Sequence, residues 1–183
     1  PAKVQSALLE AMGEQQVTVG KQTYPLPELF MVMATQNPIE QEGTYPLPEA
    51  QLDRFLMHVC IDYPERDHEA AILQLARDRA LGKELLQPHS TSPVSQQAIL
   101  DARKEVLELH MSENLENYLI QLILATREPQ QWSSQLDSWI RYGASPRGTI
   151  ALDRCARAHA WLNNRDFVTP DDIKTMAGPC LEH

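Results

Sequence analysis

The spacing of hydrophobic residues predicts a helix at the start of the chain and a hairpin after it. Residues 2–12 place apolar side chains three and four positions apart, and Gly13 follows as a helix end. Residues 16–19 and 22–24 favour β structure and flank a short turn at Gly20. These segments therefore predict an amphipathic helix followed by a two-stranded hairpin.

A continuous apolar run at residues 30–34 predicts a strand buried on both faces, as in parallel sheets covered by helices. Gln36 and Asn37 follow at its carboxyl end, where open α/β sheets gather their ligands. Asn37-Pro38 is also a common turn signal, so these residues alone leave a plain turn open. A second short strand is predicted over residues 56–61.

Beyond Tyr63-Pro64 the hydrophobic pattern predicts helices almost throughout. The clearest helix start is at Thr169, because Asp172 can reach back to it and Val168 can meet Ile173. A linker is predicted over residues 87–93 and a short strand over residues 139–142. Apolar residues recur at helical intervals in five segments, which are 66–81, 96–110, 113–126, 147–163 and 171–177.

Composition and charge narrow the function classes. The 183 residues are 43% hydrophobic and carry a formal charge of −9, with only five lysines and no basic cluster. This balance argues against a protein whose main task is to neutralise nucleic-acid phosphates or to bind an anionic membrane. No apolar run has the length of a membrane span. We therefore expect no nucleic-acid partner and no membrane insertion.

The cysteines and the chain ends add three expectations. Cys60, Cys155 and Cys180 are odd in number and far apart, which predicts neither a disulfide framework nor a metal site and favours the reducing cytoplasm. The start at Pro1 is neither an initiator methionine nor a signal peptide, so we expect a longer parent protein. Residues 181–183 resemble the remnant of an expression tag.

Two arginines are candidates for contacts with phosphate. Arg54, in Leu52-Asp53-Arg54-Phe55, is either a surface charge or an arginine finger, whose planar fork stabilises charge on a transferring phosphoryl group. Arg147 falls in the first turn of a helix capped by Ser145, where a cation opposes the helix dipole. A phosphate nearby would explain that placement, and a solvated side chain remains the alternative.

The sequence lacks other common motifs for metal binding, nucleophilic catalysis and phosphate binding. The histidines lack metal-ligand spacing, no Ser/His/Asp or Cys/His arrangement suggests a nucleophile, and no Gly-x-x-x-x-Gly-Lys-Ser/Thr phosphate loop is present. Any nucleotide chemistry at these arginines therefore needs a phosphate cradle from outside these residues.

Taken in order, these segments resemble the MoxR family of AAA+ ATPases. The likeness rests on the run Ala34 to Phe55, on Lys3 to Met12, on Gly143 to Arg147 and on Asp166 to Asp172. It implies a fold of class α/β followed by all-α: a partial AAA+ αβα core, with a parallel-sheet fragment and a β-hairpin, and a helical lid. The expected boundaries are 1–63 for the core and 64–180 for the lid.

The resemblance also assigns roles to three residues. Asn37 would be the sensor-1 residue that positions the attacking water, Arg54 the arginine finger that completes the site of the next protomer, and Arg147 the sensor-2 arginine of the lid. The Walker A and Walker B motifs would lie upstream of Pro1. The full-length protein would then use ATP and Mg²⁺, and the 183-residue chain is expected to be inactive and to bind neither tightly.

For the whole protein, the resemblance implies a cytoplasmic ATPase that forms a ring, a hexamer, and remodels client protein complexes like a chaperone. Metal cofactor insertion and a partner with a von Willebrand factor A domain belong to the same expectation. Two alternatives stay open: a non-enzymatic helical interaction module, and a nucleic-acid motor of the same clade, against which the charge of −9 counts.

Overall fold

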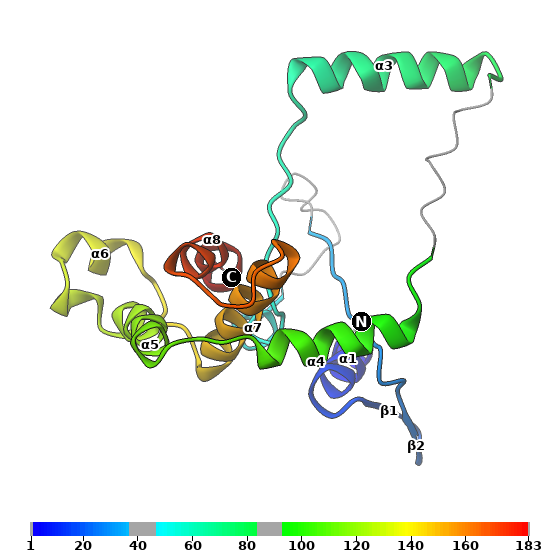
Figure 1. The fold of residues 1–183 in the computed structure, drawn as a ribbon. Helices are drawn as coiled ribbons and strands as arrows, with labels where there is room; N and C mark the ends of the chain where they lie inside the picture. The colour runs from blue at the N-terminus through cyan, green and yellow to red at the C-terminus, as the bar shows by residue number, and fades with distance from the viewer. Residues whose placement is uncertain (1, 37–46, 84–92, 183) are drawn as a thin grey trace. The chain divides into compact units, whose positions relative to one another are not determined.

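A computed structural model describes residues 2–36, 47–83 and 93–182 of the chain. The chain divides into two compact units (Figure 1). The larger unit comprises Pro1–His58 together with Leu100–His183, and the smaller unit comprises Val59–Ile99. Each is described by itself.

The larger unit begins with the predicted helix and hairpin, both of which are confirmed. Helix α1 spans Ala2–Glu14, and strands β1 (Gln16–Val19) and β2 (Gln22–Pro25) pair antiparallel. Gly20 closes the turn with a φ of +67°, a conformation that suits glycine. The carboxylate of Glu10 accepts hydrogen bonds from the backbone N–H and the hydroxyl of Thr18, at 3.0 and 2.5 Å. The hairpin is thereby fastened to α1.

The predicted strands at residues 30–34 and 56–61 are absent, so this part of the prediction is wrong. Among the described residues the only sheet is the β1–β2 pair. Met31 and Met33 are both 80% exposed, and Ile61 is 92% exposed. A parallel strand takes its hydrogen bonds from neighbouring strands and buries both faces under helices. No such neighbours are found in the described residues, and apolar character alone does not create a strand.

The helices are largely where their patterns predict. The short helix α2 spans Glu49–Leu52, and the others are α3 (Arg66–Ala80), α4 (Gln96–Glu108), α5 (Glu113–Arg127), the 3₁₀ turn η1 (Pro129–Gln131), α6 (Ser134–Trp139), α7 (Pro146–Leu162) and α8 (Pro170–Leu181). The strand predicted over 139–142 is wrong. Ser133 caps α6 by accepting from the Leu136 N–H at 3.0 Å, and this helix takes in Trp139.

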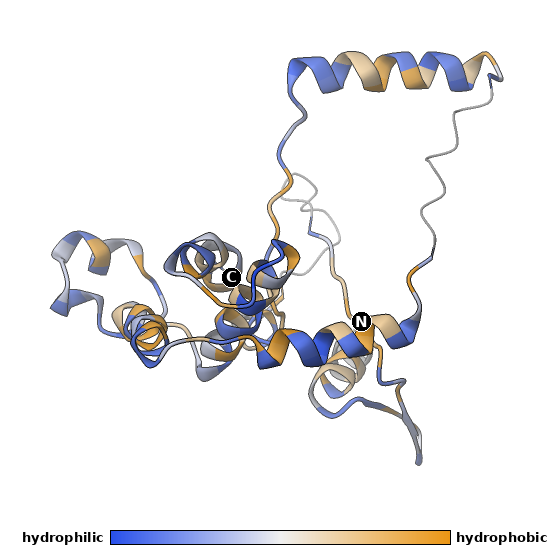
Figure 2. Ribbon diagram, viewed as in Figure 1, coloured by the Kyte–Doolittle hydropathy of each residue, from blue (hydrophilic) through white to orange (hydrophobic). Residues whose placement is uncertain are grey.

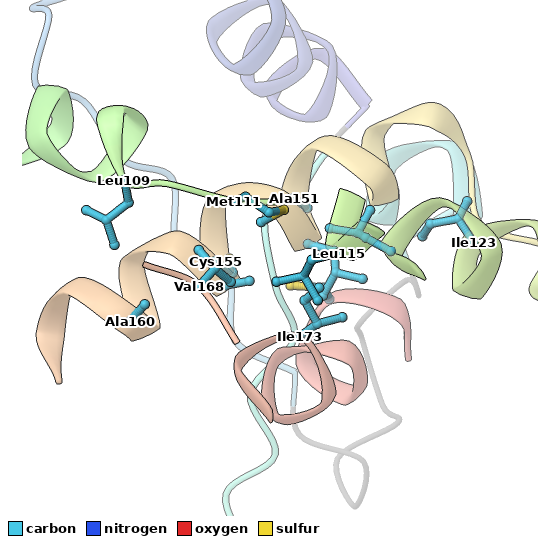
Figure 3. Close-up of a cluster of buried hydrophobic side chains, with 13 residues drawn as sticks. Leu109, Met111, Leu115, Ile123, Ala151, Cys155, Ala160, Val168 and Ile173 are labelled. Atoms are coloured by element: carbon cyan, nitrogen blue, oxygen red, sulfur yellow. The ribbon is translucent and has the colours of Figure 1, made fainter. Parts of the chain in front are cut away.

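Helix α3, in the smaller unit, carries hydrophobic and hydrophilic residues along its length, and none of its residues is buried (Figure 2). The larger unit holds the hydrophobic core, which joins α5, α7 and α8 (Figure 3). Leu119 and Ile123 come from α5, Leu152 and Ala156 from α7, and Ile173 from α8. Alanines at 151, 156 and 160 allow close approach of the α7 backbone to its neighbours.

A short parallel bridge aligns the starts of α5 and α8. The His110 N–H donates to the Asp166 carbonyl at 3.3 Å, and the Val168 N–H donates to the His110 carbonyl at 3.0 Å. Val168 and Ile173 both lie in the core, and Thr169 and Asp172 form the predicted capping box. The helix start expected from the sequence is therefore confirmed.

Asp172 is the one charged residue that is fully buried in the described part of the chain, at 1% exposure. Its Oδ2 accepts from Arg165 Nη1 at 2.6 Å and from the Thr169 N–H at 2.8 Å, and Oδ1 lies 2.6 Å from His159 Nδ1. Burial raises the pKa of Asp172, but the hydrogen bonds from Arg165, His159 and Thr169 outweigh it and hold that pKa well below its usual range. The carboxylate therefore stays ionised and only accepts hydrogen bonds.

Across the described ranges, no helix combines the length and the apolar character needed to span a lipid bilayer.

Candidate functional site

The structure places two of the three predicted site residues. Arg54 lies in the turn that follows α2, and Arg147 lies in the first turn of α7. Asn37 falls outside the described residues, and its role stays a prediction.

The turn that carries Arg54 is set by backbone hydrogen bonds. The Arg54 N–H donates to the Gln51 carbonyl at 3.2 Å, and the Phe55 N–H donates to the Leu52 carbonyl at 2.9 Å. The Arg54 guanidinium is half-buried against the last turn of α1, because a Cβ added at Gly13 would lie 3.2 Å from its Nη1. A cation is favoured at the C-terminal end of a helix, where the dipole is negative.

The start of α7 is capped as its sequence predicts. The Ser145 hydroxyl accepts a hydrogen bond from the Arg147 N–H at 3.0 Å, and Pro146 occupies the first helical position. The same hydroxyl donates to Asp53 Oδ1 at 2.5 Å. A carboxylate therefore lies beside the start of α7, where the helix dipole favours negative charge. Asp53 and Arg54 thus occupy helix ends of opposite polarity.

This contact places a negative charge near the helix start that carries Arg147. The sequence leaves two explanations for a cation in this first turn, a nearby phosphate or a solvated side chain, but Asp53 already supplies negative charge from within the chain. The helix dipole alone is therefore weaker support for a phosphate at this place. Arg147 is nevertheless exposed, and its guanidinium is accessible to an anionic ligand.

The loop before α7 is fixed to the end of α5. The Ala144 N–H donates to the Thr126 hydroxyl at 2.9 Å, and Arg127 Nε donates to the Ala144 carbonyl at 2.8 Å. A Cβ added at Gly143 would lie 2.6 Å from the Arg127 Cα, so only glycine fits without a shift of the backbone. These contacts hold the helix start that carries Arg147.

Three residues that hold this arrangement, Asp53, Thr126 and Gly143, are not predicted from the sequence to do so. The cap at Ser145 was recognisable from its neighbours in the chain, but its partner Asp53 is 92 positions away. No local pattern marks a contact over that distance. In the sequence, Asp53 stands out only as a member of the segment Leu52-Asp53-Arg54-Phe55.

Comparison with known protein families gives two matches. A model of the ATPase family associated with various cellular activities (AAA) matches residues 1–57, and one of the AAA lid domain matches residues 136–183. Chaperone MoxR1 of Mycobacterium tuberculosis is 39% identical to the chain over 184 aligned residues, which cover 100% of the chain and 47% of that protein. Protein MoxR of Paracoccus denitrificans is 30% identical over 99% of the chain and 55% of that protein. The resemblance to the MoxR family of AAA+ ATPases is confirmed.

A solved structure agrees with this MoxR assignment. A crystal structure of a candidate ATPase from Cytophaga hutchinsonii is 48% identical to the chain and superposes with a TM-score of 0.85, covering 99% of the chain and 54% of that protein. The predicted fold class, a partial AAA+ core followed by a helical lid, is thereby confirmed, although the strands expected within the core are not formed in the described residues. The MoxR-like chain spans about half the length of these relatives.

Proposed function

We propose that the full-length protein is a MoxR-type ATP hydrolase that converts ATP hydrolysis into remodelling or maturation of client protein complexes, including insertion of metal cofactors. The match to AAA and AAA lid families and the names of the MoxR relatives support this proposal. The assembly is a cytoplasmic ring, a hexamer, that works beside a von Willebrand factor A domain protein and binds no nucleic acid. Residues 1–63 belong to the ATPase core and 64–180 to the lid.

One observation carries the assignment of the site. The hydrogen bond from Ser145 to Asp53 brings the turn with Arg54 and the helix start with Arg147 together in one unit. One hydrogen bond thereby joins the two segments that carry these arginines, and planar guanidinium forks bind phosphate oxygens well.

The three residues act at different points of hydrolysis. Arg54 reaches the site of the next protomer and stabilises the charge that spreads over the transferring phosphoryl group. Arg147 contacts the phosphates of bound nucleotide from the lid, and Asn37 orients the attacking water. When bound, Mg²⁺ neutralises phosphate charge, and no residue of this chain is assigned as its ligand. The phosphate cradle itself comes from residues outside this chain.

The 183-residue chain alone is expected to be inactive, because hydrolysis needs cradle, metal and water activation together. The purified chain should show neither tight ATP binding nor turnover. Turnover that disappears in the Arg147→Ala variant would contradict this expectation, because it would mean that the chain contains a complete site.

The proposed role of Arg54 is tested in the full-length protein. Arg54→Ala should retain ATP binding, but its turnover rate should fall by about 10³-fold or more, the usual contribution of an arginine finger to kcat. Mixing this variant with a protomer defective in the phosphate loop should restore part of the activity, since each protomer supplies what the other lacks. Arg154→Ala removes an exposed arginine from α7 and serves as the matched control, with turnover near that of wild type. Absence of any rescue in the mixture would exclude action across the protomer interface.

A further inference from the structure

We propose that Asp53 is a positioning residue that couples the arginine of the lid to the arginine of the core through the hydroxyl of Ser145. This inference rests on the proposed function. It adds a physical link between the nucleotide-facing Arg147 of one site and Arg54, which serves the next site in the ring.

The link is one hydroxyl group, that of Ser145, which both donates and accepts a hydrogen bond. Ser145 Oγ donates its hydrogen to Asp53 Oδ1 at 2.5 Å and accepts from the Arg147 N–H at 3.0 Å. A hydroxyl carries one donor and two acceptor lone pairs, so both bonds can form together. The short distance is typical of a charge-assisted O–H···O⁻ hydrogen bond, which is about twice as strong as a neutral one.

The segment from Asp53 to His58 lies along the lid helices. The His58 N–H donates to the Pro179 carbonyl of α8 at 2.7 Å, and Met57 packs against the core of α5, α7 and α8. Asp53 therefore begins a stretch that is attached to the lid at both its ends, by Ser145 of α7 and by Pro179 of α8. The bond at Ser145 is the one next to both arginines.

This arrangement makes the two arginines move as a connected pair. Asp53 and Arg54 are adjacent in the chain, and the guanidinium of Arg54 lies against the last turn of α1. A shift of the start of α7 either breaks the Asp53–Ser145 bond or draws Asp53 with it, and in both cases the support of Arg54 changes. Contact between Arg147 and nucleotide is one event that would produce such a shift.

A double-mutant cycle in the full-length protein tests the coupling. Asp53→Ala and Ser145→Ala should each lower kcat/KM for ATP about tenfold, the loss expected for one charge-assisted hydrogen bond. The double variant should be no worse than Ser145→Ala, because that variant already lacks the Asp53–Ser145 bond. Ser145→Thr retains the hydroxyl and the cap and should restore activity to near the wild-type value.

Ser112→Ala provides the matched control. Ser112 caps α5 by accepting from the Leu115 N–H, so its loss weakens a helix start in the same way but leaves the arginines untouched. This variant should keep the kcat/KM of wild type at a temperature where every variant is folded. An equal loss of kcat/KM in Ser112→Ala, or losses that multiply to about a hundredfold in the double variant, would overturn the proposed coupling.

The contact is also tested without activity, which separates this inference from the proposed function. In the 183-residue chain, the unfolding midpoints of the two single variants and the double variant should show the same non-additivity. Additive losses would overturn the contact itself, even if the full-length protein hydrolyses ATP. Conversely, a full-length wild type without turnover would overturn the proposed function, whereas non-additive midpoints would still support the contact.

Discussion

The buried carboxylate of Asp172 gives the most direct test of how the lid is held together. Its side chain is 1% exposed and is bound by Arg165, His159 and Thr169, while the side chains of Arg165 and His159 are 28% and 33% exposed. Asp172→Ala removes the shared acceptor of all three. It also removes half of the capping box at the start of α8.

The expected magnitude follows from what the mutation leaves behind. Removing one partner of a buried ion pair costs about 3–5 kcal/mol, because the other charge remains unpaired. Water can reach the partly exposed Arg165 and His159, which places Asp172→Ala near the lower end, at about 3 kcal/mol. For a chain of this size that loss corresponds to a fall of about 6–12 °C in the unfolding midpoint.

Thermal and urea unfolding followed by far-ultraviolet circular dichroism measure this loss. The neighbouring Asp171→Ala is the matched control: it removes the same charge from the same helical turn, but the Asp171 side chain is 89% exposed, so little change is expected. Equal stability of the two variants would refute the reasoning, since burial is the main difference between the two carboxylates.

The stability of the wild-type lid should also depend on acid pH through Asp172. Its pKa is lower in the folded state than in the unfolded chain, where the pKa of an aspartate is about 3.9. The stabilisation is therefore fully present above that pH and is lost as the pH falls toward the folded pKa. Between about pH 4 and pH 2 the wild type should lose more stability than Asp172→Asn, and identical acid slopes would contradict this assignment.

Two further substitutions test the loop that carries α7. Gly143→Ala places a methyl group 2.6 Å from the Arg127 Cα and should cost about 1–3 kcal/mol in unfolding free energy, as overpacking usually does. Thr126→Val removes the acceptor of the Ala144 N–H and should lower the unfolding free energy by about 1 kcal/mol. Thr126→Ser retains the hydroxyl and should keep the stability of the wild type. Denaturant midpoints measure both, and a Thr126→Val variant as stable as wild type would argue against the hydrogen bond.

Much of the helical part could be predicted because its causes are local. The capping box of Thr169 and Asp172 spans four consecutive residues, and the start of α7 at Ser145-Pro146 is equally compact. Helical spacing of apolar residues then locates the core faces of α5, α7 and α8. Even so, the sequence indicates only a capping role for Asp172, because the contacts with His159 and Arg165 form only when α7 and α8 meet.

The predictions of strands at residues 30–34 and 56–61 were wrong because the causes of a parallel strand are not local. The run at residues 30–34 has the composition of a buried strand, but a parallel strand exists only when neighbours supply hydrogen bonds and helices cover its faces. Met31 and Met33 are instead mostly exposed. The prediction of the β1–β2 hairpin is confirmed because its two strands are joined by one short turn and both lie within the chain.

Caps, turns, helical periodicity and the run from Ala34 to Phe55 are all properties of neighbouring residues, so the local elements and the family resemblance can be read from the amino-acid order alone. The contact of Asp53 with Ser145 beside both arginines, and the burial of Asp172 among three donors, exist only in the folded protein. These contacts join residues far apart in the chain, whose meeting depends on how helices pack. A linear pattern of residue types does not contain that geometry.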